Sequence, residues 1–357
     1  MNKENKRIGY LDLMRVFAFL SVLVGHLFSK QLAAIANDQA VHITVRQLAQ
    51  ALYDICFSGA AGVMVFFLTS GYIIAHVLRA ESAGDFMVRR IFRIYPLFIF
   101  AVLTEMVVTH SVMQVPLPNL SEFLLKLTLL GDISSTPYAL SGVEWTLRVE
   151  IMFYIFMGVV KYFGVIDKPM YLPFVLAIAA LGLFVSGPYP NWAGWTNGYL
   201  NIFGPFLFIG VLIYLIEKRL ANPYVCLFVI CSIYIMCIQK TVALRPELKE
   251  SNFAILALVL FMSAWLLRGR ILSNTLIKNL SEMTYAVYLF HLWSWGYLEI
   301  LVSKIGFDLV PYPAQQLIIL FVFSYIATNT VEKWGIQTGR RLVERYKAKS
   351  TPLVVPT

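Results

Sequence analysis

SGAAGVMVFFLTSGYIIAHVLR, residues 58–79, is a run of 22 residues in which only His76 and Arg79, near its end, can carry a charge. About twenty apolar residues in an α-helix cross the hydrocarbon core of a bilayer. A helix suits that core because all of its backbone hydrogen bonds are made within the segment. The run is therefore predicted to be a transmembrane helix.

Similar apolar blocks recur on both sides of this run. The chain of 357 residues is 59% hydrophobic and only 14% charged, whereas soluble domains carry about 25% charged residues. We predict an all-α polytopic membrane protein, a single membrane domain over residues 1–357 that ends in a basic cytoplasmic tail over 335–357. About ten transmembrane helices are expected, at 9–29, 58–79, 92–112, 145–164, 170–187, 198–216, 223–239, 252–267, 283–303 and 314–334. The segment 120–131 is too short to span and is expected to form a surface or re-entrant helix.

The basic residues indicate the orientation of these spans. Of the 29 Lys and Arg residues, twenty fall on one set of connections, seven on the other, and two, Arg15 and Arg148, within spans. Cytoplasmic loops carry the excess of Lys and Arg, so both termini are predicted to be cytoplasmic. The formal net charge of +9 is thereby explained by membrane topology, and no nucleic-acid partner is expected.

Ionisable residues inside a span are costly and by default mark a functional site. The first span holds Asp12, Arg15 and His26. Arg15 and His26 are eleven residues apart, which corresponds to about 1100° of helical rotation and places both on one face with a rise of about 16 Å. Asp12 is spaced to pair with Arg15. The alternative is an Arg that extends to the interface and a His satisfied within the core.

A second group of charges, Arg89, Arg90 and Arg93, enters the third span. Arg90 and Arg93 are one helical turn apart, and guanidinium groups bind phosphates in a bidentate manner. The pair is a candidate phosphate site, although simple positive-inside anchoring is the simpler explanation of the same residues.

The fourth span begins with Glu144, Arg148 and Glu150. Glu150 is a candidate to orient or charge-pair His26. The alternative is a Glu144–Arg148 pair that solvates the helix end, with Glu150 at its fringe.

The ninth span carries Thr284, Tyr288, His291 and Trp295 on one face. Polar groups there could line a cavity or could hydrogen-bond between helices. Glu105 lies mid-span, and the sequence assigns it no partner. The four cysteines show no metal or disulfide spacing, and we find no HExxH or Walker motif.

Five short motifs in order resemble the membrane acyltransferase-3 family, in the stand-alone form without an SGNH-type esterase domain. They cover most of the chain from residue 10 to residue 295. Two of them have Thr where the family usually has Ser, at Thr146 and Thr284, which keeps the hydroxyl. The motifs are Arg15-x10-His26, FFLTSGYII (66–74) with Ser70 and Gly71, Arg90-Ile-Phe-Arg93, Glu144-Trp145-Thr146-Leu147-x-x-Glu150-x-x-Phe153-Tyr154, and Thr284-Tyr285-x-x-Tyr288-Leu289-x-His291.

This resemblance implies ten transmembrane helices in the bacterial inner (cytoplasmic) membrane and transfer of an acyl group, usually acetyl, from coenzyme A to a hydroxyl. The acceptors of the family are commonly O-antigen, peptidoglycan, exopolysaccharide or other glycans, and sometimes antibiotics or lipids. We expect acyl-CoA, a glycan or lipid-linked glycan and membrane lipids as partners, with no metal. Homo-oligomerisation, the acyl chain and the acylated position stay open.

The hypothetical mechanism assigns a role to each candidate residue. Arg90 and Arg93 hold the phosphates of acetyl-CoA from the cytoplasm, and its pantetheine arm follows Arg15. His26, supported by Glu150, removes the proton of the acceptor hydroxyl; an acyl-His26 intermediate is the variant. Residues assigned to the substrate cavity are Asp12, Ser70, Trp145, Tyr288 and His291.

Two other classes use the same residues differently. A secondary transporter would use the intramembrane His, Glu and Arg residues as an ion relay and could show paired, broken helices in two halves. A membrane sensor or scaffold would only pair these charges structurally and would bind no coenzyme A.

Overall fold

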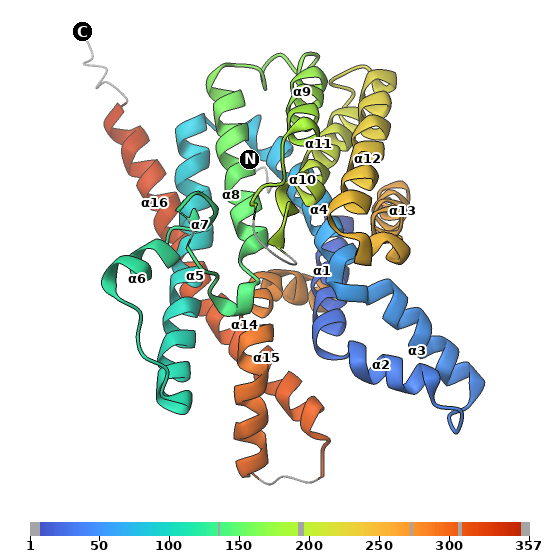
Figure 1. Ribbon diagram of the computed structural model, residues 1–357. Coiled ribbons are helices and arrows are strands. Elements are labelled where there is room, and N and C mark those ends of the chain that lie inside the picture. The colour runs from blue at the N-terminus through green and yellow to red at the C-terminus, as the bar shows by residue number, and fades with distance from the viewer. Residues whose placement is uncertain (1–7, 135, 192–195, 272–273, 306–308, 351–357) are drawn as a thin grey trace. The chain divides into compact units, whose positions relative to one another are not determined.

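The computed structural model describes residues 8–134, 136–191, 196–271, 274–305 and 309–350, and these residues form helices and connecting loops without a β-strand (Figure 1). The α-helices are α1 Gly9–Leu27, α2 Ser29–Asn37, α3 Ile43–Cys56, α4 Ala60–Leu78, α5 Ala83–Met113, α6 Leu120–Lys126, α7 Gly131–Ser134, α8 Trp145–Tyr162, α9 Leu172–Val185, α10 Tyr199–Phe203, α11 Pro205–Glu217, α12 Pro223–Leu244, α13 Phe253–Leu266, α14 Thr275–Ile305, α15 Tyr312–Ala327 and α16 Lys333–Ser350. Short turns η1 Phe57–Gly59, η2 Leu140–Gly142 and η4 Pro246–Ser251 are 3₁₀-helical, and η5 Thr328–Glu332 is a π-helical turn.

The all-α membrane fold predicted from the sequence is confirmed. Within the described residues, six helical segments are long and apolar enough to cross a membrane. They are Gly9–Leu27, Ile43–Leu78, Ala83–Met113, Tyr199–Glu217, Pro223–Leu244 and Tyr312–Ala348.

The four other predicted spans also coincide with helices. Helices α9 and α13 are apolar but have only 14 residues each, so they are short for the hydrocarbon core. Helix α8 carries Arg148, Glu150 and Lys161, and α14 carries charges near both of its ends. The total of ten spans and the cytoplasmic placement of both termini stay predictions. The segment predicted to be too short to span contains the seven-residue helix α6.

The chain forms two compact units, each described by itself. Unit one comprises Met1–His76 and Val165–Thr284, and unit two comprises Val77–Gly164 and Tyr285–Thr357. Helix α14 contributes its first residues to unit one and the rest to unit two.

In unit one, α4 packs on α11 through a reciprocal pair of glycines. A Cβ on Gly71 would collide with the carbonyl oxygen of Leu207, and a Cβ on Gly210 would collide with that of Leu68. Small residues allow membrane helices to approach until their backbones touch, and packing is the main force between helices in lipid. Ser70, beside this contact, is buried.

In unit two, the long helix α5 is the central packing element. Helix α8 packs on it, with the ring of Tyr154 edge-on to Phe86 at 5.8 Å between centroids. Tyr285 of α14 donates a hydrogen bond to the carbonyl oxygen of Ile94 at 2.9 Å. Helix α16 also lies along α5 (Figure 1), so the arginine-rich start of α5 is flanked by packed helices.

Candidate functional site

The first helix, α1, carries one group of the predicted residues. It is uninterrupted from Gly9 to Leu27, so the helical geometry that places Arg15 and His26 on one face applies. Arg15 is half-buried, and His26 is exposed although its neighbours Gly25 and Leu27 are buried. The protein therefore leaves part of the imidazole surface uncovered between two buried neighbours.

Asp12 of α1 is buried and accepts a hydrogen bond from the Ser281 hydroxyl at 2.8 Å. Sequence analysis had not proposed Ser281 as a partner. Since Ser281 is 269 residues away in the chain, spacing along one helix could not have identified it. The contact ties the N-terminal turn of α1 to the start of α14.

A tight turn before α4 lies against His26. Ser58 and Gly59 both have positive φ, 52° and 67°, and the backbone of Ser58 forms a hydrogen bond with the imidazole. A Cβ on Gly59 would lie 3.0 Å from the Cα of Val22 and 3.5 Å from Nε2 of His26. The left-handed conformation and the close approach both favour glycine at position 59, and the turn holds the imidazole beside a backbone dipole.

Arg90 and Arg93 lie at the start of α5 and are half-buried. The guanidinium carbon of Arg90 lies 5.5 Å from the centroid of the Phe86 ring, and within the described part of the chain its buried Nε has no hydrogen-bond partner. The neighbouring Arg89 instead pairs with Glu81 at 2.6 Å. The structure thus keeps the two predicted phosphate-binding arginines on one stretch of helix.

Glu150 is buried in α8, where its Oε1 accepts a hydrogen bond from the Tyr154 hydroxyl at 2.5 Å. The two residues are one helical turn apart, and both belong to the predicted WSLxxExxFY-like motif. Glu150 and His26 belong to different units, so their predicted pairing stays a prediction. Trp145, the first residue of α8, is half-buried.

Tyr288 is held by the first turn of α8 and by the residues just before it. Its hydroxyl accepts a hydrogen bond from the Thr146 hydroxyl at 2.8 Å and donates one to the carbonyl oxygen of Val143 at 2.7 Å. His291 is buried, and its Nδ1 lies 2.8 Å from the carbonyl oxygen of Tyr288. The structure therefore joins two of the sequence motifs within unit two, at the Thr146–Tyr288 contact.

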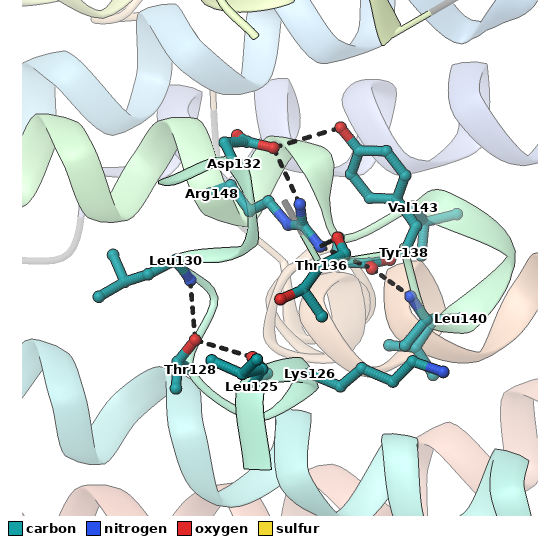
Figure 2. A network of polar contacts seen from close by, with 12 residues as sticks. Leu125, Lys126, Thr128, Leu130, Asp132, Thr136, Tyr138, Leu140, Val143 and Arg148 are labelled. Carbon is teal, nitrogen blue, oxygen red and sulfur yellow. Dashed lines mark hydrogen bonds and ion pairs between the residues drawn. The ribbon is translucent and has the colours of Figure 1, made fainter. Parts of the chain in front are cut away.

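Next to this contact lies a buried charge network that sequence reasoning identified only in part (Figure 2). Arg148 pairs with Asp132 at 2.8 Å and lies 3.6 Å from Glu144, and all three side chains are at most 3% exposed. The Tyr138 ring stacks under the guanidinium group at 4.2 Å. A Cβ on Gly131 would lie 2.5–2.6 Å from the guanidinium atoms.

This network corrects the interpretation of Arg148 as a helix-end group. The Glu144–Arg148 pair exists, but it is buried, and the shorter contact is made by Asp132 of the short helix α7, sixteen positions earlier. Glu105, for which the sequence offered no partner, accepts a hydrogen bond from the backbone N–H of Leu140 in η2 at 2.8 Å. Contacts of this kind have no helical periodicity that could reveal them.

Two carboxyl groups therefore share one guanidinium group. Asp132 makes the close ion pair, and burial raises the pKa of Glu144 to about 8, while Arg148 and the backbone N–H of Ala139 act in the opposite direction. A protonated Glu144 leaves the buried network neutral near pH 7, because Arg148 is then balanced by Asp132 alone.

A sequence model of a protein family described as an acyltransferase domain matches residues 8–331. The chain belongs to this acyltransferase family. All five motifs lie within the matched residues, whereas α16, which begins at Lys333, lies beyond them.

Two curated relatives show how far the similarity extends. Nodulation protein 10 of Rhizobium leguminosarum bv. viciae is 28% identical over 244 residues, which cover 60% of this chain and 61% of the relative. Acyltransferase MdmB of Streptomyces mycarofaciens is 31% identical over 156 residues, which cover 42% of this chain and 38% of the relative. This acyltransferase-family chain thus spans less than two thirds of each relative. No solved structure matches it.

Proposed function

We propose that this protein is a membrane O-acyltransferase. It moves an acyl group, acetyl in the simplest case, from cytosolic acyl-CoA to a hydroxyl of a glycan at the outer face of the bacterial inner membrane. The observation that carries the proposal is the exposed imidazole of His26 between the buried Gly25 and Leu27 of an apolar helix, eleven residues from a half-buried Arg15. Family membership and the relative named as an acyltransferase support the same chemistry.

The proposed reaction divides the work between the two groups of residues. Arg90 and Arg93 bind the donor phosphates as charge-assisted hydrogen-bond donors. His26 removes the proton from the glycan hydroxyl, and the hydroxyl oxygen attacks the carbonyl carbon of the thioester. The C–S bond breaks, and the coenzyme leaves as a thiolate that takes up a proton.

Glu150, Ser70 and Tyr288 complete the proposed site. Ser70, which belongs to the same unit as His26, supplies a hydroxyl to polarise the thioester carbonyl. The roles of Glu150 as support for the histidine base and of Tyr288 as a second hydroxyl stay predictions from the sequence. A two-step route through an acyl-His26 intermediate uses the same residues. An acyl-enzyme trapped in the absence of acceptor would favour that route, and ternary-complex kinetics without one would favour direct transfer.

The test measures coenzyme A thiol released by the purified protein from acetyl-CoA with a glycan acceptor. We expect acceptor-dependent release by the wild type, none by His26→Ala, and unchanged release by the matched control His110→Ala, an exposed histidine at the end of α5. Normal release by His26→Ala would refute its role. Arg90→Ala should raise the apparent KM for acetyl-CoA, and an unchanged KM would remove it from the donor site.

The acceptor is identified in the cell. A deletion strain should lose an acetyl mass from O-antigen or exopolysaccharide, as measured by glycan mass spectrometry. Absence of acceptor-dependent thiol release by the purified wild type, together with ion-coupled uptake of a solute into proteoliposomes, would favour a transporter instead.

A further inference from the structure

Helix α16 packs closely against the arginine-bearing start of α5. Gly335 and Gly339 make this possible, because a Cβ on Gly335 would lie 2.6 Å from the carbonyl oxygen of Phe92, and a Cβ on Gly339 would lie 2.6 Å from the Cβ of Phe92. At the far end of the contact, Lys347 pairs with Asp85 at 2.8 Å. Of the segment expected from the sequence to be a basic tail, residues 335–350 belong to the docked helix α16, and residues 351–357 lie outside the described residues.

These contacts fix the register of the two helices. Residue numbers rise along α16 as they fall along α5, so the helices are antiparallel. The contacts Gly335–Pro96, Gly339–Phe92 and Lys347–Asp85 all join residues whose numbers add to 431 or 432. Position 340 of α16 therefore lies level with position 91 of α5, between Arg90 and Arg93.

The same contacts determine which flank each arginine occupies. The residues of α5 that contact α16, namely Asp85, Phe92 and Pro96, form a stripe along one side of that helix. A helix turns by about 100° per residue, so Arg93 lies about 80° and Arg90 about 140° around the helix axis from this stripe, in the direction of increasing residue number. On α16 the stripe is formed by Gly335, Gly339, the buried Val343 and Lys347, and position 340 lies about 80° from its centre in the same sense. Because the two right-handed helices are antiparallel, the flank of α5 with Arg90 and Arg93 and the flank of α16 with Arg340 lie on the same side of the helix pair.

Glu81 and Glu150 lie near enough to Arg90 to act on its charge, but the close ion pairs in this region are made by other basic residues. Arg89 and Lys347 have their ion pairs with Glu81 and Asp85. For Arg90, Arg93 and the exposed Arg340, the described part of the chain shows no ion pair. Three guanidinium groups on one flank attract a ligand with several negative charges.

We propose that Arg340 is the third arginine of the donor-phosphate site and binds the donor together with Arg90 and Arg93. This inference rests on the proposed function, since the ligand is the acyl-CoA donor. Its diphosphate and its separate ribose phosphate offer more anionic groups than two arginines one turn apart can contact. Residue 340 lies outside the segment matched by the family, which ends at residue 331.

The neighbouring Arg341 provides a matched control. It is exposed, like Arg340, but lies about 180° from the contact stripe, on the outer face of α16. The experiment measures acetyl-CoA binding to the purified full-length protein and steady-state kinetics for Arg340→Ala, Arg341→Ala and Arg340→Lys. We expect Arg340→Ala to raise the dissociation constant and the KM for acetyl-CoA about tenfold or more with kcat unchanged, Arg340→Lys to recover part of the loss, and Arg341→Ala to match the wild type.

A donor without its ribose phosphate, acetyl-dephospho-CoA, identifies the group contacted. Loss of the Arg340→Ala penalty with this probe assigns Arg340 to the ribose phosphate, and a persisting penalty assigns it to the diphosphate; both results support the site. Equal weakening by Arg340→Ala and Arg341→Ala, or no effect of either, would overturn it and indicate a general basic surface for anionic lipids. If wild-type protein fails to bind acetyl-CoA, the proposed function falls as well, so the two failures are distinguishable.

Discussion

Replacing Arg148 by Met is the sharpest test of the buried charge network. The substitution keeps a long side chain but removes the cation that lies 2.8 Å from Asp132 and 3.6 Å from Glu144. The Asp132 side chain has no exposed surface and the Arg148 side chain has 3%, so water cannot replace the lost partner. We expect the free energy of unfolding to fall by about 3–5 kcal/mol, as for other buried ion pairs that lose one member.

A surface pair of the same unit supplies the control for this change. Lys126 pairs with Glu122 at 3.0 Å one helical turn apart, and the Glu122 side chain is 37% exposed. Exposed pairs of this kind contribute about 0–1 kcal/mol, so Lys126→Met should change stability little. Both variants are compared with the wild type by reversible denaturant unfolding in the same detergent micelles, followed by tryptophan fluorescence.

A compensating substitution separates the charge effect from loss of packing. Asp132→Leu combined with Arg148→Met removes both members of the close pair, and apolar replacement of a whole buried pair is often neutral or stabilising. We expect the double variant to be more stable than Arg148→Met alone. A loss of under about 1 kcal/mol for Arg148→Met, equal to that of Lys126→Met, would refute the expectation that the buried Arg148–Asp132 pair stabilises the fold.

Three further predictions concern neighbouring features. Burial raises the pKa of Glu144 to about 8, above its value in the unfolded chain. The free energy of unfolding contributed by this group should therefore be greatest at low pH and fall as pH rises toward and through 8. Unfolding measured from pH 6 to 9 should show this decrease in the wild type and not in Glu144→Gln. Gly339→Leu places a side chain where Phe92 lies, so α16 should detach from α5. We expect faster proteolytic cleavage after Lys333 in this variant than in the control Gly269→Leu, where the structure leaves open space for a side chain. Tyr288→Phe removes the hydroxyl that bonds Thr146 and Val143 and should cost about 1 kcal/mol of stability and lower kcat; wild-type values for both would contradict a role for this hydroxyl.

The apolar pattern predicted the helices well because length and hydropathy are local properties. All ten predicted spans fall on helices, including α1 with Arg15 and His26 in one continuous segment. The number of spans is harder to predict from hydropathy, because α8 includes three charged residues. A helix that buries its charges against other parts of the protein does not look like a span by composition alone.

The relative placement of candidate residues was predictable where spacing along one helix carries the information, whereas their functional roles stay predictions. Arg90 with Arg93, and Glu144 with Arg148, are such pairs. Arg148 and Glu105 find their partners in α7 and η2, at Asp132 and the N–H of Leu140. The path of the chain between these short elements has no periodicity from which the contacts could be predicted. The docking of α16 was missed for a related reason: a glycine pair four residues apart in a polar, basic segment does not indicate a helix interface until its partner helix is known.

Glycines beside charged groups link the fold to the proposed chemistry. Gly59 lies against His26, Gly131 lies against the guanidinium group of Arg148, and Gly339 brings α16 onto the arginine-bearing part of α5. In lipid, helices gain little from burying apolar side chains and associate through close packing instead. A missing Cβ therefore does two things at once: it lets backbones approach, and it leaves room for an imidazole or guanidinium group that would otherwise be displaced from its neighbours. It follows that substitutions at these glycines should alter function at least as strongly as conservative changes of the charged residues themselves.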